Sequence, residues 1–310
     1  MRIIKETHIK FMSQRRASFM VSLFLILAGI GSLVMKQGPK LGIDFQGGTL
    51  IAVQFTQPME ITHIRSALNA VPLDGRVIDL SKEEMKHFGG ETNVAIRLTP
   101  RENEGEQFVQ SVITHLSTSF PDLVPEDSKD FILTIEKVGP KIGAELSGKA
   151  VMAIGSALIL ILLYISIRFE FIFALGAIIA LSHDVLITLG IFSILDYEIS
   201  LPIIAAFLTI VGYSLNDTII IFDRIRENIK SNKRASYIDT VDKSINQSIS
   251  RTLITSLTTF LVVFILWVFG GEVIHLFAFA MMIGVIIGTY SSIYVASPFV
   301  VLLHSKKHTK

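Results

Sequence analysis

The sequence predicts a polytopic α-helical membrane protein, with six transmembrane helices and one ferredoxin-like α+β domain between the first and second helix. Half of its 310 residues are hydrophobic and only 18% are charged, whereas soluble domains carry about 25% charged residues. Six apolar runs have the length of a bilayer-spanning helix, and the basic residues gather on one side of them. Between the first two runs lies a long polar insert with the periodicity of strands and helices.

The composition also excludes several classes of function. The net charge of +1 leaves no surplus of Lys and Arg for a phosphate-binding surface, so we expect no nucleic-acid partner. The chain has no cysteine, which excludes a disulfide framework, thiol catalysis and a thiolate metal site.

The first apolar run is Ala17–Met35, and Lys10, Arg15 and Arg16 precede it. It approaches the roughly 20 residues that cross a bilayer, and no A-x-A-like cleavage site follows it. We therefore interpret it as an uncleaved anchor rather than a signal peptide. The later predicted spans are Ala150–Ile167, Phe171–Leu195, Leu201–Phe222, Thr252–Phe269 and Val273–Leu303.

The basic residues of the short loops predict the orientation, because Lys and Arg resist translocation. They flank one end of the spans: Arg2, Lys5, Lys10, Arg15, Arg16, Arg168, Arg224, Arg226, Lys230, Lys233, Arg234, Lys306, Lys307 and Lys310. The opposite loops carry only acidic charges, at Asp196, Glu198 and Glu272. Both termini are therefore expected in the cytoplasm. The predicted domains are an N-terminal segment with helix 1 (1–36), an external domain (37–148), helices 2 to 6 (149–303) and a cytoplasmic tail (304–310).

The insert alternates between strand and helix periodicity. Its predicted elements are strand Thr49–Phe55, helix Glu60–Val71, strands Arg76–Leu80 and Asn93–Leu98, helix Glu104–Ser119 and strand Phe131–Val138. The order β-α-β-β-α-β is typical of a ferredoxin-like domain, and such a module can bury its own core.

We expect no cofactor and no metal in this insert. The histidines His63, His87 and His115 stand at no metal-ligand spacing. The stretch "GIDFQGGT" resembles a phosphate-binding loop, but Gly48 stands where that loop needs a lysine. We interpret its glycines as a flexible lead into the first strand, with Asp44 as a turn residue.

Asp217 raises the main functional question, because it lies in an apolar run where a carboxylate costs roughly 2.5–3.5 kcal/mol on insertion scales. At helical spacing it shares a face with Thr209, Tyr213 and Arg224, with Ser214 and Asn216 beside that face. Other spans carry polar groups at Ser182, His183, Asp184, Ser248, Arg251, Thr252, Thr255 and Thr259. Such groups must turn inward and find partners.

Each of these positions has a plainer interpretation. Asp217 could reach towards the cytoplasmic interface, although aspartate is too short to reach far. Arg251 could simply obey the positive-inside rule; its depth, which matches that of Asp217, favours a pair. For His183 and Asp184, a helix-stabilising hydrogen bond and a role in proton movement remain equal alternatives.

In the last span, Gly284, Gly288, Ser292 and Ala296 follow one another at four-residue intervals. Such a seam of small residues lets helices approach closely. We expect it to offer a close-packing surface, to a partner chain or inside the bundle.

An ordered series of motifs resembles the SecF family of bacterial protein-export membrane subunits, in the resistance–nodulation–division superfamily. The series runs from Leu41 to Pro298 and comprises "LGIDFQGGT", "VGPKIGAEL", "RFEF", "ALSHDVLITLGIFS", "VGYSLNDTIIIFDRIREN", "SRTLITSLTT" and "GTYSSIYVASP".

The resemblance implies a subunit of the bacterial inner membrane whose external domain lies in the periplasm. It would pair with a SecD-like subunit beside the Sec translocon of SecY, SecE and SecG, and with a membrane insertase. It would use the proton-motive force to pull unfolded secreted polypeptide outward, without chemical-step catalysis. Asp217 and Arg251 match the proton path of the family; Tyr213, Asn216, His183, Asp184 and Thr255 are candidate supporting residues.

A carboxyl group that meets and leaves a guanidinium can switch between its neutral and charged forms, which makes a relay between Asp217 and Arg251 physically reasonable. Two rival functions stay open. The chain could be half of a proton-driven small-molecule exporter, which would need a partner half. It could also be a structural scaffold of the translocon or insertase, with Asp217 and Arg251 only holding helices together.

Overall fold

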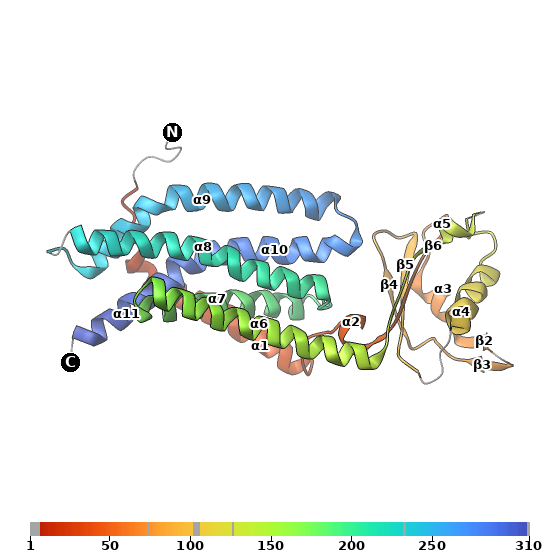
Figure 1. Cartoon of the computed structure of the whole chain (residues 1–310). Helices are drawn as coiled ribbons and strands as arrows, with labels where there is room; N and C mark the ends of the chain where they lie inside the picture. The colour runs from red at the N-terminus through yellow and green to blue at the C-terminus, as the bar shows by residue number, and fades with distance from the viewer. Residues whose placement is uncertain (1–6, 74, 102–105, 126, 232–233, 309–310) are drawn as a thin grey trace. The chain divides into compact units, whose positions relative to one another are not determined.

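The computed structural model describes residues 7–73, 75–101, 106–125, 127–231 and 234–308. The chain divides into a helical unit and an α+β unit, drawn in Figure 1. The helical unit comprises Met1–Lys40 and Ala150–Lys310, and the α+β unit comprises Leu41–Lys149.

Among the described residues, six helical runs are long and apolar enough to cross a membrane. They are α1 (Arg15–Met35) after the 3-10 helix η1 (Phe11–Gln14), α6 (Pro140–Arg168), α7 (Phe171–Ile194), α8 (Leu201–Ser231), α9 (Tyr237–Phe269), and a sixth run of α10 (Glu272–Ser291), the π-helical turn η3 (Ser292–Ala296) and α11 (Ser297–His308). The predicted fold class is confirmed.

The helix α9 is longer than its apolar run predicts, because it begins at Tyr237 rather than Thr252. The backbone N–H of Asp239 donates to the hydroxyl of Ser236, which caps the helix. Val241 and Ile245 are buried at a spacing of one turn in this extension. An amphipathic first third therefore precedes the membrane-spanning part of α9.

Two glycines bring α1 and α7 into backbone contact. A Cβ atom on Gly190 of α7 would lie 2.7 Å from Cα of Gly29 on α1, and the converse distance is also 2.7 Å. No side chain larger than hydrogen fits at either position. Close approach of this kind is a common basis of helix association in membranes.

The small-residue seam of the sixth run packs inside the helical unit. A Cβ atom on Gly284 would lie 2.2 Å from Ile210 of α8, and one on Gly288 would lie 2.9 Å from Cβ of Ser214. Ser292 and Ala296 are buried as well. The seam joins α10 to α8 within this chain, so it is not a free surface for a partner chain.

The contact of Gly29 with Gly190 generates a prediction. Gly190→Leu should lower the stability of the purified protein by about 1–3 kcal/mol, because overpacking forces the two helices apart. Thermal unfolding in detergent measures the loss. The matched control is Gly31→Leu, since a Cβ at Gly31 meets no atom within 4 Å. Equal losses for both variants would show that leucine acts without regard to the helix contact.

A polar clip fastens the end of α1 to the segment between α7 and α8. The ammonium group of Lys36 donates to a carboxylate oxygen of Asp196 at 2.9 Å and to the backbone oxygen of Ser193 at 2.7 Å. Lys40 donates to the other oxygen of Asp196 at 3.1 Å. The hydrogen bond from Lys36 and then that from Lys40 lower the pKa of Asp196 below its ordinary value.

A lowered pKa makes the contribution of the clip depend on pH. The carboxylate of Asp196 stabilises the fold above its ordinary pKa, and this contribution is lost as the pH falls through the lowered pKa of the folded state. Asp196→Asn should therefore reduce thermal stability at neutral pH and converge with the parent below about pH 4. The side chain is 58% exposed, so solvent screening limits the effect to under about 1 kcal/mol. A difference that persists in acid would contradict the ionic origin.

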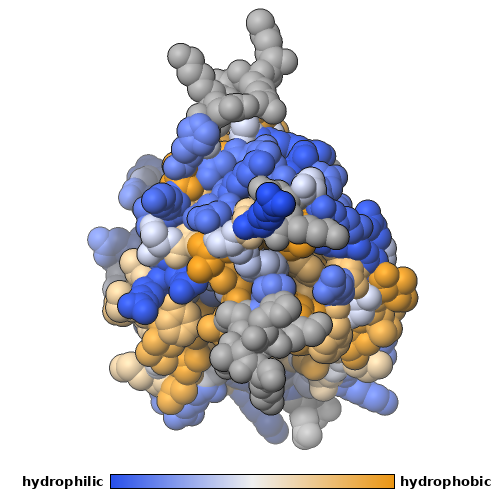
Figure 2. Space-filling model, turned by 90° about the vertical axis from the view of Figure 1, so that its left-hand side faces the viewer, coloured by the Kyte–Doolittle hydropathy of each residue, from blue (hydrophilic) through white to orange (hydrophobic). Residues whose placement is uncertain are grey.

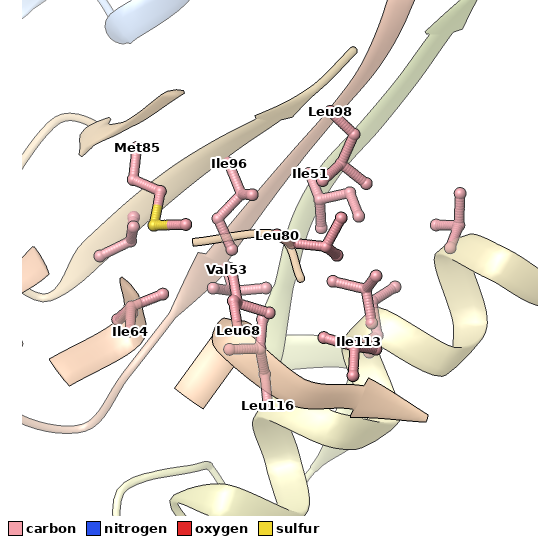
Figure 3. Close-up of a cluster of buried hydrophobic side chains, with 14 of the residues drawn as sticks. Ile51, Val53, Ile64, Leu68, Leu80, Met85, Ile96, Leu98, Ile113 and Leu116 are labelled. Carbon is pink, nitrogen blue, oxygen red and sulfur yellow. The ribbon is translucent and has the colours of Figure 1, made fainter. Parts of the chain in front are cut away.

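The α+β unit is built on a four-stranded antiparallel sheet of order β4-β5-β1-β6. Its elements are α2 (Ile43–Gln46), β1 (Gly48–Gln54), α3 (Ile61–Ala67), η2 (Leu68–Ala70), β2 (Val71–Leu73), β3 (Arg76–Ile78), β4 (Glu84–His87), β5 (Asn93–Leu98), α4 (Glu106–Ser119), α5 (Ser128–Phe131) and β6 (Ile132–Val138). Apolar residues of β1 and β5 meet those of α3 and α4 in one core, shown in Figure 3.

One predicted strand lies outside the main sheet. The strand predicted at Arg76–Leu80 is present as β3, but it pairs with β2 in a separate two-stranded sheet. The fourth strand of the main sheet is β4, which buries only Met85 while Lys86 and His87 are exposed. An edge strand with one buried side chain has no hydrophobic alternation to detect, which is why periodicity missed it.

Gly47 and Gly48, at the start of β1, are constrained by packing rather than flexible. Gly47 and Gly48 have φ values of 76° and 123°, which are backbone conformations that other residues rarely adopt. A Cβ atom on Gly48 would lie 2.6 Å from the backbone oxygen of Leu98. Asp44 also differs from expectation, because it lies in the short helix α2 rather than in a turn.

Candidate functional site

The helix α8 places two polar side chains inside the helical unit, one turn apart. Ser214 and Asp217 are buried, as are Ile210 and Ile221 on the same face. This face packs against α10, where Gly288 leaves room for Ser214. Each polar residue belongs to a separate group of intramembrane contacts, which we name the Asp217 cluster and the Asp184 cluster.

The Asp217 cluster comprises Asp217 of α8, Ser256 of α9 and Thr289 of α10. Oγ of Ser256 lies 3.3 Å from Oδ2 of Asp217 and 2.7 Å from Oγ1 of Thr289. Oδ1 of Asp217 is buried without a hydrogen-bond partner among the described residues. Three helices therefore meet at a carboxyl group that is only partly satisfied.

A count of hydrogens shows how weakly the charged form of Asp217 is held. Thr289 donates its hydroxyl hydrogen to the backbone oxygen of Val285 at 2.8 Å. The short contact between Thr289 and Ser256 therefore needs the single hydrogen of Ser256. A carboxylate at Asp217 must share that hydrogen, whereas a protonated Asp217 could donate to Ser256 and complete all three contacts. The cluster thus favours a carboxyl group that carries a proton.

Arg251 does not contact Asp217 in this structure. Its side chain is exposed on α9, and no ion pair or hydrogen bond joins the two groups in the described part of the chain. It is near enough for its charge to act on the Asp217 carboxyl group. The predicted pair between Asp217 and Arg251 is therefore not formed in this structure.

The other predicted residues near Asp217 lie apart from its cluster. Asn216 is exposed, and Thr255 donates to the backbone oxygens of Arg251 and Thr252 on its own helix. The hydroxyl of Tyr213 is buried and has no partner among the described groups. Among the described residues, no hydrogen bond joins any of the three to Asp217.

The Asp184 cluster joins four helices. Oδ1 of Asp184 lies 2.9 Å from Nδ1 of His183, its neighbour on α7. Oδ2 accepts hydrogen bonds from Ser214 of α8 at 2.6 Å and from Ser291 of α10 at 2.8 Å. On the other side of the imidazole, Nε2 of His183 lies 3.0 Å from Oγ of Ser22 on α1. Both oxygens of this carboxyl group are satisfied, in contrast to those of Asp217.

Sequence reasoning missed several members of both clusters: Ser22, Ser256, Thr289, Tyr290 and Ser291. The predicted polar stripe of α9 contained the signal for one of them, because Ser256 lies one turn after Thr252. Small hydroxyl residues are common on both buried and lipid-facing surfaces of membrane helices, so their type alone does not mark a site.

No group of three or more His, Cys, Asp and Glu side chains that could hold a metal ion occurs among the described residues. The buried polar groups of the helical unit are hydroxyl, imidazole and carboxyl groups, which can exchange hydrogen bonds and protons.

Two family models match this chain. The model described as "Protein export membrane protein SecD/SecF, C-terminal" matches residues 123–306, and the "SecD/SecF GG Motif" model matches residues 33–59. The first match covers more than half of the sequence. The chain belongs to the SecD/SecF protein-export family. The second match contains Gly47 and Gly48, the two glycines that the strand β1 requires.

Relatives within this family align over almost their whole length. The protein translocase subunit SecF of Magnetococcus marinus is 44% identical over 97% of this chain and 93% of its own. The SecF subunit of Vibrio alginolyticus is 44% identical, with 97% and 92% covered. The resemblance noted in the sequence is confirmed.

Solved SecDF structures share the fold. The crystal structure of SecDF from Thermus thermophilus, described as a translocon-associated membrane protein, is 37% identical and superposes with a TM-score of 0.83 over 97% of this chain. SecDF in a super-membrane-facing form is 36% identical, with a TM-score of 0.69 over 99% of this chain. The chain spans only 39% and 40% of those two longer proteins.

Proposed function

We propose that this protein is a subunit of the Sec protein-export machinery, which uses the proton-motive force to promote translocation of secreted polypeptides across the cytoplasmic membrane. Identity of 44% to SecF subunits over nearly the full chain supports the export role. Coverage of about two fifths of SecDF supports a SecD-like partner that supplies the remaining part. The other proposed partners are the translocon of SecY, SecE and SecG, a membrane insertase and unfolded polypeptide.

The observation that carries proton coupling is the unpartnered oxygen of Asp217. This carboxyl group is 1% exposed, and its charged form receives at most one shared hydrogen bond. An isolated charge in hydrocarbon is costly, so the group takes up a proton unless a cation approaches. Arg251, an exposed cation on α9, is the group that would do so. Proton uptake at Asp217 would therefore change the packing of α9 against α8.

Energy from the membrane potential has the right size for such a change. One elementary charge crossing 100 mV releases about 2.3 kcal/mol, enough to bias two helix packings that differ by a similar amount. No covalent step is needed. We assign the protein a transport role rather than an enzymatic one.

We propose that both termini and the α8–α9 loop face the cytoplasm and that residues 37–148 lie in the periplasm of an inner-membrane protein. Figure 2 shows hydrophilic residues gathered over the end of the helical unit at which α8 ends. Described basic residues near this end include Arg168, Arg224, Arg226, Lys230 and Arg234. Others used for the sequence prediction, namely Arg2, Lys5, Lys233 and Lys310, lie outside the described residues.

Reporter fusions test this topology. A fusion after Gly148 should be active only as a periplasmic reporter, because the insert would be translocated. A fusion near Lys233 should be active only as a cytoplasmic reporter, because basic loops resist translocation. Paired alkaline phosphatase and fluorescent-protein fusions at each site provide the measurement. Cytoplasmic activity at Gly148 would reverse the orientation of the whole chain.

The proton relay has its own test. Asp217→Asn and Arg251→Met should each reduce the proton-gradient-dependent part of export at least about tenfold, because residues that act as a unit fail together. The double variant should be no worse than either single variant. The measurement is export into inverted membrane vesicles with and without a proton gradient, in the presence of the SecD-like partner.

Leu257→Ala is the matched control, because Leu257 is an exposed apolar residue on the same helix, α9. All variants should insert and assemble, since Asp217→Asn and Arg251→Met each remove a costly membrane charge. Full gradient-dependent export by Asp217→Asn would make this carboxyl group a structural element and refute the relay. Strictly additive losses would indicate two independent roles.

A further inference from the structure

The Asp184 cluster is a buried titratable site that the proposed relay does not use, and its protonation follows from a count of hydrogens. The hydroxyl of Tyr290 donates its one hydrogen to the backbone oxygen of Ser18 at 2.7 Å. The 3.0 Å contact between Tyr290 and Ser22 therefore needs the hydrogen of Ser22. Ser22 then has none left for His183, so Nε2 of the imidazole carries a hydrogen and donates it to Ser22.

The contact between His183 and Asp184 then needs one more hydrogen. With that hydrogen on Nδ1, the pair is an imidazolium and a carboxylate; with it on Oδ1, the pair is a neutral imidazole and a carboxylic acid. Both arrangements have no net charge and hold the same number of protons. Without this proton, the lone pair of Nδ1 of His183 would face a lone pair of Oδ1 of Asp184 at 2.9 Å.

A second proton is disfavoured by charge. Ser291 could turn its hydroxyl hydrogen to the backbone oxygen of Gly288 at 3.1 Å and accept from a protonated Oδ2, but the pair would then carry a net positive charge. His183 and Asp184 are 5% and 0% exposed, and a buried charge without a counter-charge is costly. Tyr290 of α10 is the other titratable side chain recorded against the pair among the described residues; it stacks on His183 with ring centroids 6.1 Å apart. The helices α1 and α8 contribute hydroxyl groups.

We propose that His183 and Asp184 form a closed clasp that keeps its single proton throughout the working cycle and positions α8 by joining α7 to α1, α8 and α10. This inference rests on the proposed function, because it assigns the clasp a part in proton-driven export. Asp217 lies three residues after Ser214 on α8, so the clasp fixes the depth at which Asp217 faces α9. The clasp residues are positioning residues and not proton carriers.

The clasp leaves the contact between α8 and α9 as the one able to change. Both carboxyl oxygens of Asp184 and Nδ1 of His183 have a hydrogen-bond partner. At the α8–α9 contact, Ser256 divides one hydrogen between two acceptors. Movement driven by Asp217 would therefore separate α9 from a body made of α1, α7, α8 and α10.

Substitutions of Asp184 test the clasp in vesicles that contain the full complex. Asp184→Leu should reduce gradient-dependent export at least about tenfold, because it removes every acceptor of the clasp. Gradient-dependent export by Asp184→Asn should stay within about twofold of the parent. Its oxygen can accept from Ser214 and Ser291 while one N–H donates to Nδ1 of a neutral His183, which preserves the absence of net charge and the hydrogen of that contact.

The pH profile separates positioning from proton transfer. Between about pH 5 and pH 8, export by Asp184→Asn should follow the profile of the parent. If Asp184→Asn loses gradient-dependent export as completely as Asp217→Asn does, Asp184 carries protons and the clasp is refuted. Parental export by Asp184→Leu would also refute it. The matched control is Leu186→Ala, on an exposed position of the same helix.

Two further measurements keep the test decisive if Asp184→Leu fails to fold. Combined Ser214→Ala and Ser291→Ala remove the donors to Oδ2 and should shift the pH profile of export; an unchanged profile overturns the proposal. Infrared difference spectra of the purified complex between about pH 5 and pH 8 should contain no carboxyl band that Asp184→Asn removes. Such a band would overturn the closed clasp even if the proposed export function failed, because this readout does not depend on export.

Discussion

Hydrocarbon offers no hydrogen-bond partners, so every polar group inside the membrane must be satisfied by the chain itself, and the helical unit is organised around this constraint. Asp184 meets it with contacts to His183, Ser214 and Ser291. Asp217 does not, because its Oδ1 is unpartnered and its Oδ2 shares the hydrogen of Ser256. The same helix, α8, thus takes part in one saturated carboxyl cluster and one unsaturated cluster. We propose that this difference separates a structural carboxyl group from one that exchanges its proton.

Close helix packing makes these hydrogen bonds possible. Gly288 allows α10 to approach Ser214, and a larger residue there would move Ser291 away from Asp184. Gly29 and Gly190 bring α1 to α7 in the same way, which lets Ser22 reach His183. The π-helical turn η3 begins directly after Ser291, and such turns often occur at functional sites. The small residues therefore allow the close helix packing that brings the buried hydroxyl groups within hydrogen-bond distance.

The sequence predicted the spans, most strands and the inward orientation of Asp217, because each depends on local signals: apolar length, alternation and a charge in an apolar run. It did not predict β4, where a single buried Met85 gives no period. It also did not predict Ser256 or Thr289 as partners of Asp217, because the spacing within one helix does not determine how that helix is rotated against its neighbours. The seam at Gly284 and Gly288 was recognisable in the sequence. Whether it packs inside the chain or against a partner chain was not, since small residues suit both kinds of contact.

Magnitudes explain why a proton-driven bundle would contain both kinds of cluster. One charge moving through 100 mV supplies about 2.3 kcal/mol, and a typical hydrogen bond contributes about 0.5–1.5 kcal/mol net. That energy is sufficient to exchange the single weak contact between Asp217 and Ser256. It is insufficient to open the joined contacts of Ser22, His183, Asp184, Ser214 and Ser291 together. A limited driving energy therefore acts where the contacts are weakest, which is where Asp217 of α8 and Thr289 of α10 meet Ser256 of α9.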